Sequence, residues 1–238
     1  MAAFSYDVDG SVSVMRMNDG ENRFNPSFMT AFNKVLDQIE KEKSVRTLVV
    51  RSSHHKIFSN GIDLEWLAPV LRRGDADAAR RFFYDMNQLF KRILLYPMTT
   101  IAAVSGHAFA AGAILCCAFD FRFMRSDRGF FCLPEVDLGI PFLPGMNALL
   151  RKVIPIHKLV EMQLTGSRLT AYDCEEHHII VKACHMNRLM DEVLDFAGEL
   201  NKDRAVTAEL KSRLYADIVH TLTVTDKPYI ESGKYNIS

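Results

Sequence analysis

Two segments of the chain could bring backbone N–H groups close to an anionic ligand. In residues 56–64, Lys-Ile-Phe-Ser-Asn-Gly-Ile-Asp-Leu, Gly61 permits a close approach at which the Asn60 N–H can meet a ligand oxygen. Residues 105–113, Ser-Gly-His-Ala-Phe-Ala-Ala-Gly-Ala, are mostly small and precede an apolar stretch that predicts a helix. The N–H groups of Ala111 and Gly112 then lie at a helix N-terminus, where unpaired donors favour negative charge. An ordinary Asn-Gly turn and close helix–sheet packing are the alternative interpretations.

A third segment, Pro134-Glu-Val-Asp-Leu-Gly139, carries two acids, Glu135 and Asp137, after an apolar strand. Acids are uncommon in a core, and on an extended segment two acids two residues apart point in opposite directions. We therefore expect one carboxylate to face a cavity while the other makes a salt bridge or caps a turn. A carboxylate in an apolar pocket has a raised pKa and can move protons near neutral pH. Two surface acids in a loop are the alternative.

The other chemically active residue types form no familiar site. The histidine pairs at 54–55 and 177–178 are adjacent, whereas two metal ligands on one helix face need the i, i+4 spacing. The five cysteines show no ligand spacing and predict buried free thiols. Neither a Gly-x-Ser-x-Gly elbow nor a glycine-rich phosphate loop is present. We predict no metal, and keep only His107 as a histidine that could assist the site.

The elements that must position these segments alternate between strands and helices up to about residue 140. Asn25 and Pro26 suit the start of a helix, and apolar residues from Phe28 to Ile39 recur at helical spacing. We predict strands at 4–8, 12–17, 47–50, 100–104, 119–124 and 130–133. Two further helices are predicted at 76–95 and 113–118. This order predicts an α/β core. Helices then dominate, at 147–153, 157–164, 171–177, 187–200 and 205–222, interrupted by the apolar run 179–181.

Composition narrows the class of protein. The chain has 238 residues, with 29 basic and 29 acidic side chains, and its zero net charge gives no overall attraction to nucleic acid or to an anionic membrane. No apolar run approaches the ~20 residues that span a bilayer. The N-terminus lacks the apolar core of a targeting peptide, and Asn236-Ile237-Ser238 differs from a Ser-Lys-Leu signal. We expect a cytoplasmic protein.

Taken together in order and spacing, the three segments resemble the crotonase superfamily of enoyl-CoA hydratases and isomerases. The resemblance covers roughly residues 10–185 and is most specific at 58–64, 101–112 and 131–139. It implies a spiral of ββα units over residues 1–185 with an acyl-CoA site, followed by a helical region, 186–238, that assembles a homotrimer or a hexamer. It places two oxyanion N–H groups on Asn60 and Ala111 and the catalytic acid on Glu135. The implied acyl-CoA contacts are Lys56, Asn60, Gly61, Ile62, Asp63, Leu64, Ala111, Gly112 and Pro134, with coenzyme A part of the substrate and no separate cofactor.

One departure from the family pattern favours a particular reaction. Hydratases of this family carry a second glutamate where this chain has Ile114, and adding water calls for acid–base work that two carboxylates share. Moving a double bond from C3 to C2 needs one base only. Residues 120–129 and 135–139 are also especially similar to monofunctional Δ3,Δ2-enoyl-CoA isomerases. The sequence therefore favours an isomerase. A hydratase, a thioester hydrolase acting through Glu135 or Asp137, and a non-catalytic or RNA-binding relative remain as alternatives.

Overall fold

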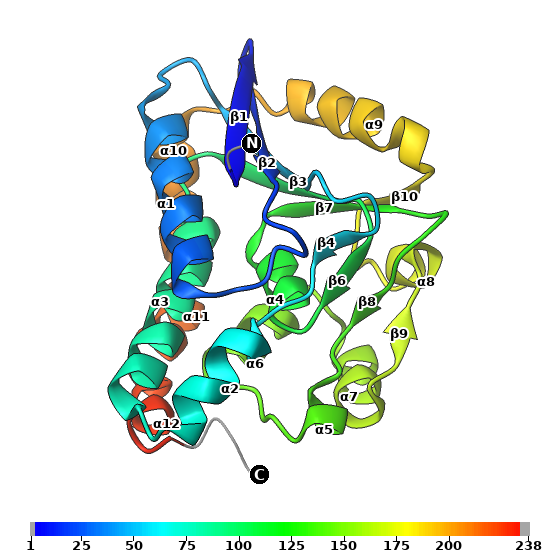
Figure 1. The fold of residues 1–238 in the computed structure, drawn as a ribbon. Helices are drawn as coiled ribbons and strands as arrows, with labels where there is room; N and C mark the ends of the chain where they lie inside the picture. The colour runs from blue at the N-terminus through cyan, green and yellow to red at the C-terminus, as the bar shows by residue number, and fades with distance from the viewer. Residues whose placement is uncertain (1–2, 234–238) are drawn as a thin grey trace.

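The computed structural model describes residues 3–233, so the carboxyl-terminal tripeptide considered above lies outside the described residues. The chain builds two β-sheets flanked by helices (Figure 1). The larger sheet has the order β1-β2-β3-β5-β7-β10, with β1 antiparallel to β2 and the other neighbours parallel. Its strands are β1 Phe4–Asp9, β2 Val12–Met17, β3 Thr47–Ser52, β5 Thr99–Val104, β7 Phe121–Arg125 and β10 Lys182–Cys184.

The smaller sheet runs beside the larger one in the order β4-β6-β8-β9, and β8 and β9 are antiparallel. Its strands are β4 Ile57–Ser59, β6 His107–Phe109, β8 Phe131–Cys132 and β9 Arg168–Leu169. The chain visits the two sheets alternately, through β3 and β4, then β5 and β6, then β7 and β8. A helix follows each pair: α2 Leu64–Arg72, α4 Ala111–Ala118 and α5 Glu135–Leu138. This repeat confirms the predicted spiral of ββα units.

The remaining helices cover the sheets and close the carboxyl-terminal part of the described chain. They are α1 Pro26–Lys41, α3 Ala76–Leu94, α6 Pro144–Arg151, α7 Ile156–Thr165, α8 Ala171–Glu176, α9 Met186–Glu199, α10 Arg204–Leu214, α11 Ala216–His220, the π-helix η1 Thr221–Thr225 and α12 Lys227–Glu231. Helix α9 packs on the larger sheet, where Leu189, Val193 and Ala197 join one buried cluster with Val49 and Ile101. Thus α9 covers the core although it lies beyond the predicted boundary at residue 185.

Local signals account for several of these elements. The Asn25 side chain accepts a hydrogen bond from the Phe28 N–H at 2.9 Å, and Pro26 opens α1 as predicted. The predicted strands 4–8 and 12–17 are confirmed and form an antiparallel hairpin, with Gly10 in the left-handed region between β1 and β2 (φ 56°). Helix α4 is buried at every residue, so it crosses the core. The buried Arg122 and the half-buried Lys152 donate to backbone carbonyls at its carboxyl end and satisfy acceptors that the helix leaves open.

Two local predictions were wrong. Glu135 and Asp137 lie on the short helix α5 and not on an extended segment, because Gly139 closes a helical turn in the left-handed conformation (φ 66°). The single helix expected over 205–222 breaks at Tyr215 and gives way to α11 and η1.

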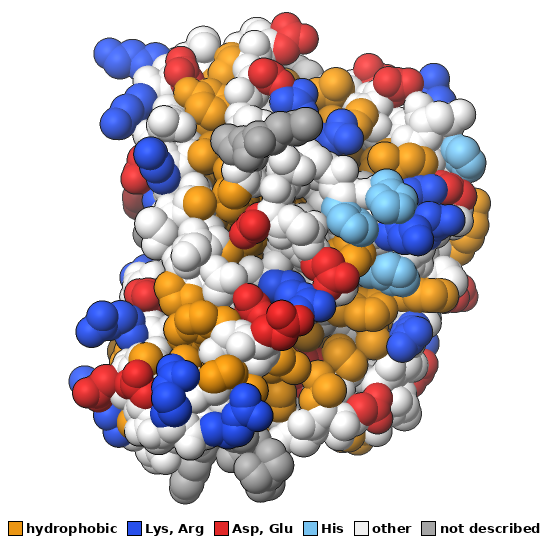
Figure 2. All heavy atoms as spheres, viewed as in Figure 1, with side chains coloured by type: hydrophobic (Ala, Val, Ile, Leu, Met, Phe, Trp, Pro, Cys, Tyr) orange, Lys and Arg blue, Asp and Glu red, His pale blue; other side chains and the backbone are white. Residues whose placement is uncertain are grey.

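Charged side chains of both signs are interspersed over the face shown in Figure 2. Among residues 3–233, no helix combines the length and the apolar character that crossing a membrane requires. Within the same residues, no three His, Cys, Asp or Glu side chains gather in a way that could hold a metal ion.

Candidate active site

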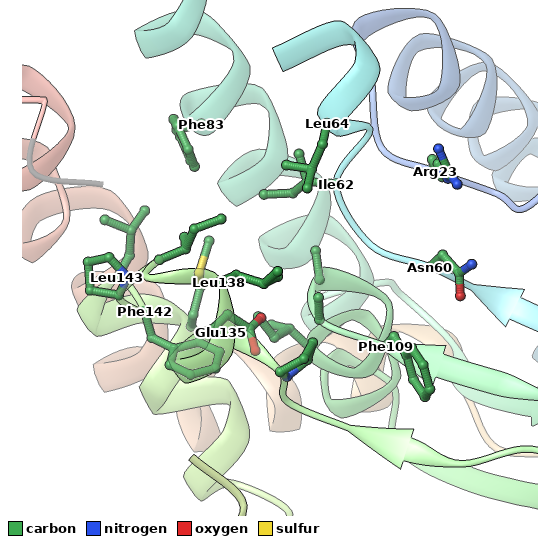
Figure 3. Close-up of a pocket in the computed structure, with 17 residues that line it drawn as sticks. Arg23, Asn60, Ile62, Leu64, Phe83, Phe109, Glu135, Leu138, Phe142 and Leu143 are labelled. Atoms are coloured by element: carbon green, nitrogen blue, oxygen red, sulfur yellow. The ribbon is translucent and has the colours of Figure 1, made fainter. Parts of the chain in front are cut away.

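A largely apolar cavity of about 290 Å³ lies where the three predicted segments meet α3 and α6 (Figure 3). The segments contribute Asn60, Ile62 and Leu64 from the first, Phe109, Ala110, Ala111 and Ile114 around the second, and Pro134, Glu135 and Leu138 from the third. Six of the predicted site residues therefore meet around one space: Asn60, Ile62, Leu64, Ala111, Pro134 and Glu135. A ligand in this cavity contacts all three segments at once.

Glu135 is the candidate acid–base group of this cavity. Its side chain points into the space between the walls (Figure 3), and the residue is only 7% exposed. The Oε2 atom is buried and has no hydrogen-bond partner, and burial raises the pKa of this carboxyl to about 8. Asp137, two residues further on, is exposed and does not line the cavity. Glu135 thus combines a pKa near neutrality with a carboxyl oxygen, Oε2, that has no hydrogen-bond partner among the described residues.

This pKa sets the expected pH dependence of turnover. Because only the ionised carboxylate can accept a proton, kcat/KM should rise about tenfold per pH unit below pH 8 and level off above it. Steady-state assays between pH 5.5 and 9.5 measure this profile. A rate that is flat from pH 6 to 9 would contradict a base with a raised pKa.

One pair of backbone donors lies at the start of α4. The N–H groups of Ala111 and Gly112 have no acceptor among the described residues, because they precede the first hydrogen bonds of the helix. Ala110, with φ 52° and ψ −127°, turns the chain from β6 into the helix without a side-chain cap. Ala111 lines the cavity, and Gly112 is packed so tightly that a Cβ there would lie 2.5 Å from the Ser59 carbonyl oxygen. The predicted donor at Ala111 is therefore available.

The donor predicted at Asn60 is not available. Its N–H donates to the Glu21 carbonyl oxygen at 3.1 Å, a contact between residues far apart in the sequence. Two residues later, the Ile62 N–H has no acceptor among the described residues, although Phe24 hydrogen-bonds to both of its neighbours. Ile62 also lines the cavity. The free donor of this loop is therefore Ile62.

Gly61 brings this loop against the start of α4. Its φ is +75°, and a Cβ at this position would lie 2.8 Å from the Ala110 Cβ and 2.9 Å from both the Ala111 nitrogen and the Phe109 carbonyl oxygen. Such distances are too short for any side chain, so only glycine allows this contact. The free N–H groups of Ile62 and Ala111 consequently flank one tight junction at the cavity wall.

The other predicted contacts have structural roles or lie elsewhere. The Asp63 side chain accepts from the Glu65 and Trp66 N–H groups at 3.1 and 3.3 Å, which caps α2. Lys56 is exposed and does not line the cavity. His107 is half-buried, with its ring near Phe109 and an Nδ1 atom that has no partner, and it too does not line the cavity.

The rest of the cavity wall comes from elements outside the three segments. Phe83 reaches it from α3, and residues between α5 and the first turn of α6 contribute Ile140, Pro141, Phe142, Leu143 and Met146. Arg23 lies at the cavity edge, paired with Glu21 at 2.6 Å and with Glu65 at 3.1 Å. The proline-bracketed apolar run 140–144 was the available signal, since such a run suits a wall built from a loop.

Comparisons with known proteins identify relatives of this chain. The family described as Enoyl-CoA hydratase/isomerase matches residues 7–230. Enoyl-CoA delta isomerase 2, peroxisomal, from Arabidopsis thaliana is 32% identical over 218 residues, covering 84% of this chain and 86% of the relative. Enoyl-CoA delta isomerase 3 from the same plant is 28% identical over 215 residues, covering 87% of this chain and 89% of the relative.

Solved structures show the same fold. A probable enoyl-CoA hydratase from Mycobacterium tuberculosis superposes with a TM-score of 0.88 at 21% identity, covering 98% of this chain and 96% of that structure. The ββα spiral and the cavity at the meeting point of its loops, together with a family match over nearly the whole sequence, lead to one assignment. The chain belongs to the enoyl-CoA hydratase/isomerase family.

Proposed function

We propose that the protein is an acyl-CoA isomerase that converts a 3-enoyl-CoA into the conjugated 2-enoyl-CoA. The observation that carries this proposal is the number of carboxylates in the cavity. Among the described residues that line it, Glu135 is the one carboxylate. Ile114, where hydratases carry a second glutamate, is 1% exposed and lines the same cavity. The plant relatives named enoyl-CoA delta isomerases support the same reaction type.

In the proposed reaction, the thioester oxygen lies between the N–H groups of Ile62 and Ala111. The Glu135 carboxylate removes a proton from C2, and the released electron pair forms a C1–C2 double bond while negative charge moves to the oxygen. Two backbone donors stabilise this dienolate, each by roughly 3 kcal/mol in other oxyanion holes. Glu135 then returns the proton to C4, the double bond forms between C2 and C3, and the carbonyl is restored. One base therefore completes the cycle.

The apolar surroundings favour isomerisation over addition of water. Ile114, Pro134 and Leu138 line the cavity with Glu135, and none of them can orient or ionise a water molecule. The same residues raise the Glu135 pKa by desolvation, which strengthens the carboxylate as a base. Coenzyme A enters this proposal as part of the substrate, and no other cofactor takes part.

Assays of 3-enoyl-CoA and 2-enoyl-CoA side by side test the proposal. Isomerisation should create the ultraviolet absorbance of the conjugated thioester from the 3-enoyl substrate and leave the 2-enoyl substrate unhydrated. Loss of that absorbance from 2-enoyl-CoA would identify a hydratase, and release of free coenzyme A would identify a hydrolase.

Assembly and location also remain proposals. Helices α7 and α10 each expose apolar side chains at i, i+4 and i+8: Ile156, Val160 and Leu164, and Val206, Leu210 and Leu214. Such stripes support the predicted homotrimer or hexamer, since large exposed apolar surfaces commonly mark interfaces. A single-chain mass in sedimentation experiments would contradict the oligomer.

We keep a cytoplasmic location as a proposal, although two of the plant relatives are named as peroxisomal.

A further inference from the structure

The apolar end of the cavity is formed by two helices that a buried carboxylate joins. In Figure 3, Arg23, Asn60 and Phe109 lie on one side of Glu135, whereas Phe83 and Leu143 lie on the other. Phe83 belongs to α3, and Leu143 directly precedes α6. The distance between these two helices therefore decides how far a ligand can extend beyond Glu135.

Asp226 connects both helices. Its Oδ1 accepts a hydrogen bond from the Gly145 N–H of α6 at 2.7 Å, and its Oδ2 accepts one from Asn87 Nδ2 of α3, also at 2.7 Å. Asn87 lies one helical turn beyond Phe83, and Gly145 lies two residues beyond Leu143. Asp226 is 0% exposed, Asn87 is 2% exposed, and none of the described Lys or Arg residues forms a salt bridge with Asp226. The Asp226 side chain thus hydrogen-bonds to both helices at the apolar end of the cavity.

The local structure around Asp226 supports these two hydrogen bonds. In η1 the Asp226 N–H donates to the Thr221 carbonyl oxygen at 3.0 Å, five residues back, so the Leu222 carbonyl does not receive that hydrogen bond. The Leu222 oxygen instead accepts from Asn87 Nδ2 at 3.1 Å. On the other wall, a Cβ at residue 145 would lie 2.5 Å from Asp226 Oδ2 and 2.6 Å from Leu222 Cδ2. The close fit therefore requires glycine there.

We propose that Asp226 is a positioning residue that sets the length of the acyl chain that the cavity accepts. This inference rests on the proposed function, because it takes the ligand to be an acyl-CoA with its carbonyl near Ile62 and Ala111. Beyond Glu135 the chain meets Phe83, Leu143 and Met146, which offer no hydrogen-bonding group, so the tail is an unsubstituted hydrocarbon. Asp226 touches no part of the cavity itself and acts through the two helices it joins.

Binding of saturated acyl-CoAs of increasing length, from acetyl-CoA upward, tests the inference without requiring turnover. In the wild type, Kd should fall about fourfold per added methylene until the tail reaches the wall, and then stop falling. We call the chain length at which Kd stops falling the break. In Asp226→Ala the break should move to a chain at least two carbons longer, while the Kd for acetyl-CoA stays unchanged. Asp226→Asn keeps an acceptor for the Gly145 N–H but places its own amide donor against Asn87 Nδ2, so it releases the α3 side only and should move the break by less than Asp226→Ala does.

Asp217→Asn is the matched control, because it removes an exposed carboxylate from the same helical region. Its profile should equal that of the wild type. If Asp226→Ala does not fold, Asn87→Ala, which releases only the α3 side, should move the break in the same direction. An unchanged break in a folded variant, or an equal loss of affinity at every length including acetyl-CoA, would overturn the inference.

The same series separates this inference from the proposed function. A wild type that binds acyl-CoAs with a length-dependent break but does not isomerise 3-enoyl-CoA would contradict only the isomerase. A wild type that isomerises, with Asp226 variants of unchanged length preference, would contradict only the role of Asp226. A wild type that binds no acyl-CoA would overturn both.

Discussion

Glu135→Gln should lower kcat/KM for 3-enoyl-CoA by about 10³-fold or more, because it removes the only group proposed to carry the proton. The amide is close in shape to the carboxyl and lies in the same cavity, so the affinity for a saturated acyl-CoA should change less than about threefold. Steady-state kinetics and calorimetric titration measure the two quantities. Retained turnover in this variant would refute the role of Glu135.

The same variant should be more stable than the wild type at neutral and alkaline pH. In the folded protein the Glu135 pKa is raised to about 8 from 4.5, so the unfolded chain loses this proton first. The folded state is therefore destabilised progressively as pH rises from 4.5 to 8, by about 3 kcal/mol at pH 7. Glutamine does not titrate. The difference in the free energy of unfolding between Glu135→Gln and the wild type should therefore be larger at pH 8 than at pH 5, as measured by denaturant titration.

Asp137→Asn is the control for this experiment, since it removes an exposed carboxylate from the same short helix. Its kcat/KM should stay within about twofold of the wild type. An equal loss of activity in both variants would point to the charge of α5 as a whole and away from proton transfer by Glu135.

Gly61→Ala should reduce kcat/KM by about 10²-fold while the protein still folds. The new methyl group would approach the Ala111 nitrogen at 2.9 Å and the Ala110 Cβ at 2.8 Å, so the loop must move away from the start of α4. The two free N–H groups then no longer bind one thioester oxygen as proposed, and losing one such donor typically costs 10²–10³ in kcat. Kinetics together with a thermal melt separate this effect from unfolding.

Gly74→Ala provides a matched comparison. Gly74 has nearly the same backbone conformation, with φ +69° against +75°, but a Cβ there meets nothing within 4 Å. Both variants therefore carry the strain of a left-handed alanine, about 1 kcal/mol. Only Gly61→Ala displaces the donors, so Gly74→Ala should keep wild-type kinetics. Equal kinetics in the two variants would mean that the Gly61 junction does not form the anion site.

The parts of the fold that follow from local signals could be predicted from the sequence. Asn25 and Pro26 identify the start of α1, and the apolar stripe of α3 identifies nearly its whole length, because capping and helical periodicity act over a few residues. Glu135 and Asp137 could likewise be identified as candidates, because acids within an apolar stretch are uncommon, and the family resemblance then selected Glu135.

The parts that depend on distant partners could not be predicted. Asn60 and Ile62 are equally plausible donors in the sequence, and only the hydrogen bond from Asn60 to Glu21 decides between them. The π-helix near Leu222 likewise has no local marker, because the partner of its free carbonyl, Asn87, lies on α3. The apolar wall from Ile140 to Met146 is a loop and a helix start, where periodicity is too short to detect.

The donors at Ile62 and Ala111 belong to the peptide backbone, and this has a consequence for how such a protein evolves. Every amino acid except proline keeps a backbone N–H at these positions. Most substitutions therefore change the shape of the proposed anion site without removing its donors. In the proposed mechanism, new reactions can then arise by exchanging the few side chains around this site, such as those at 114 and 135, while its two backbone donors remain.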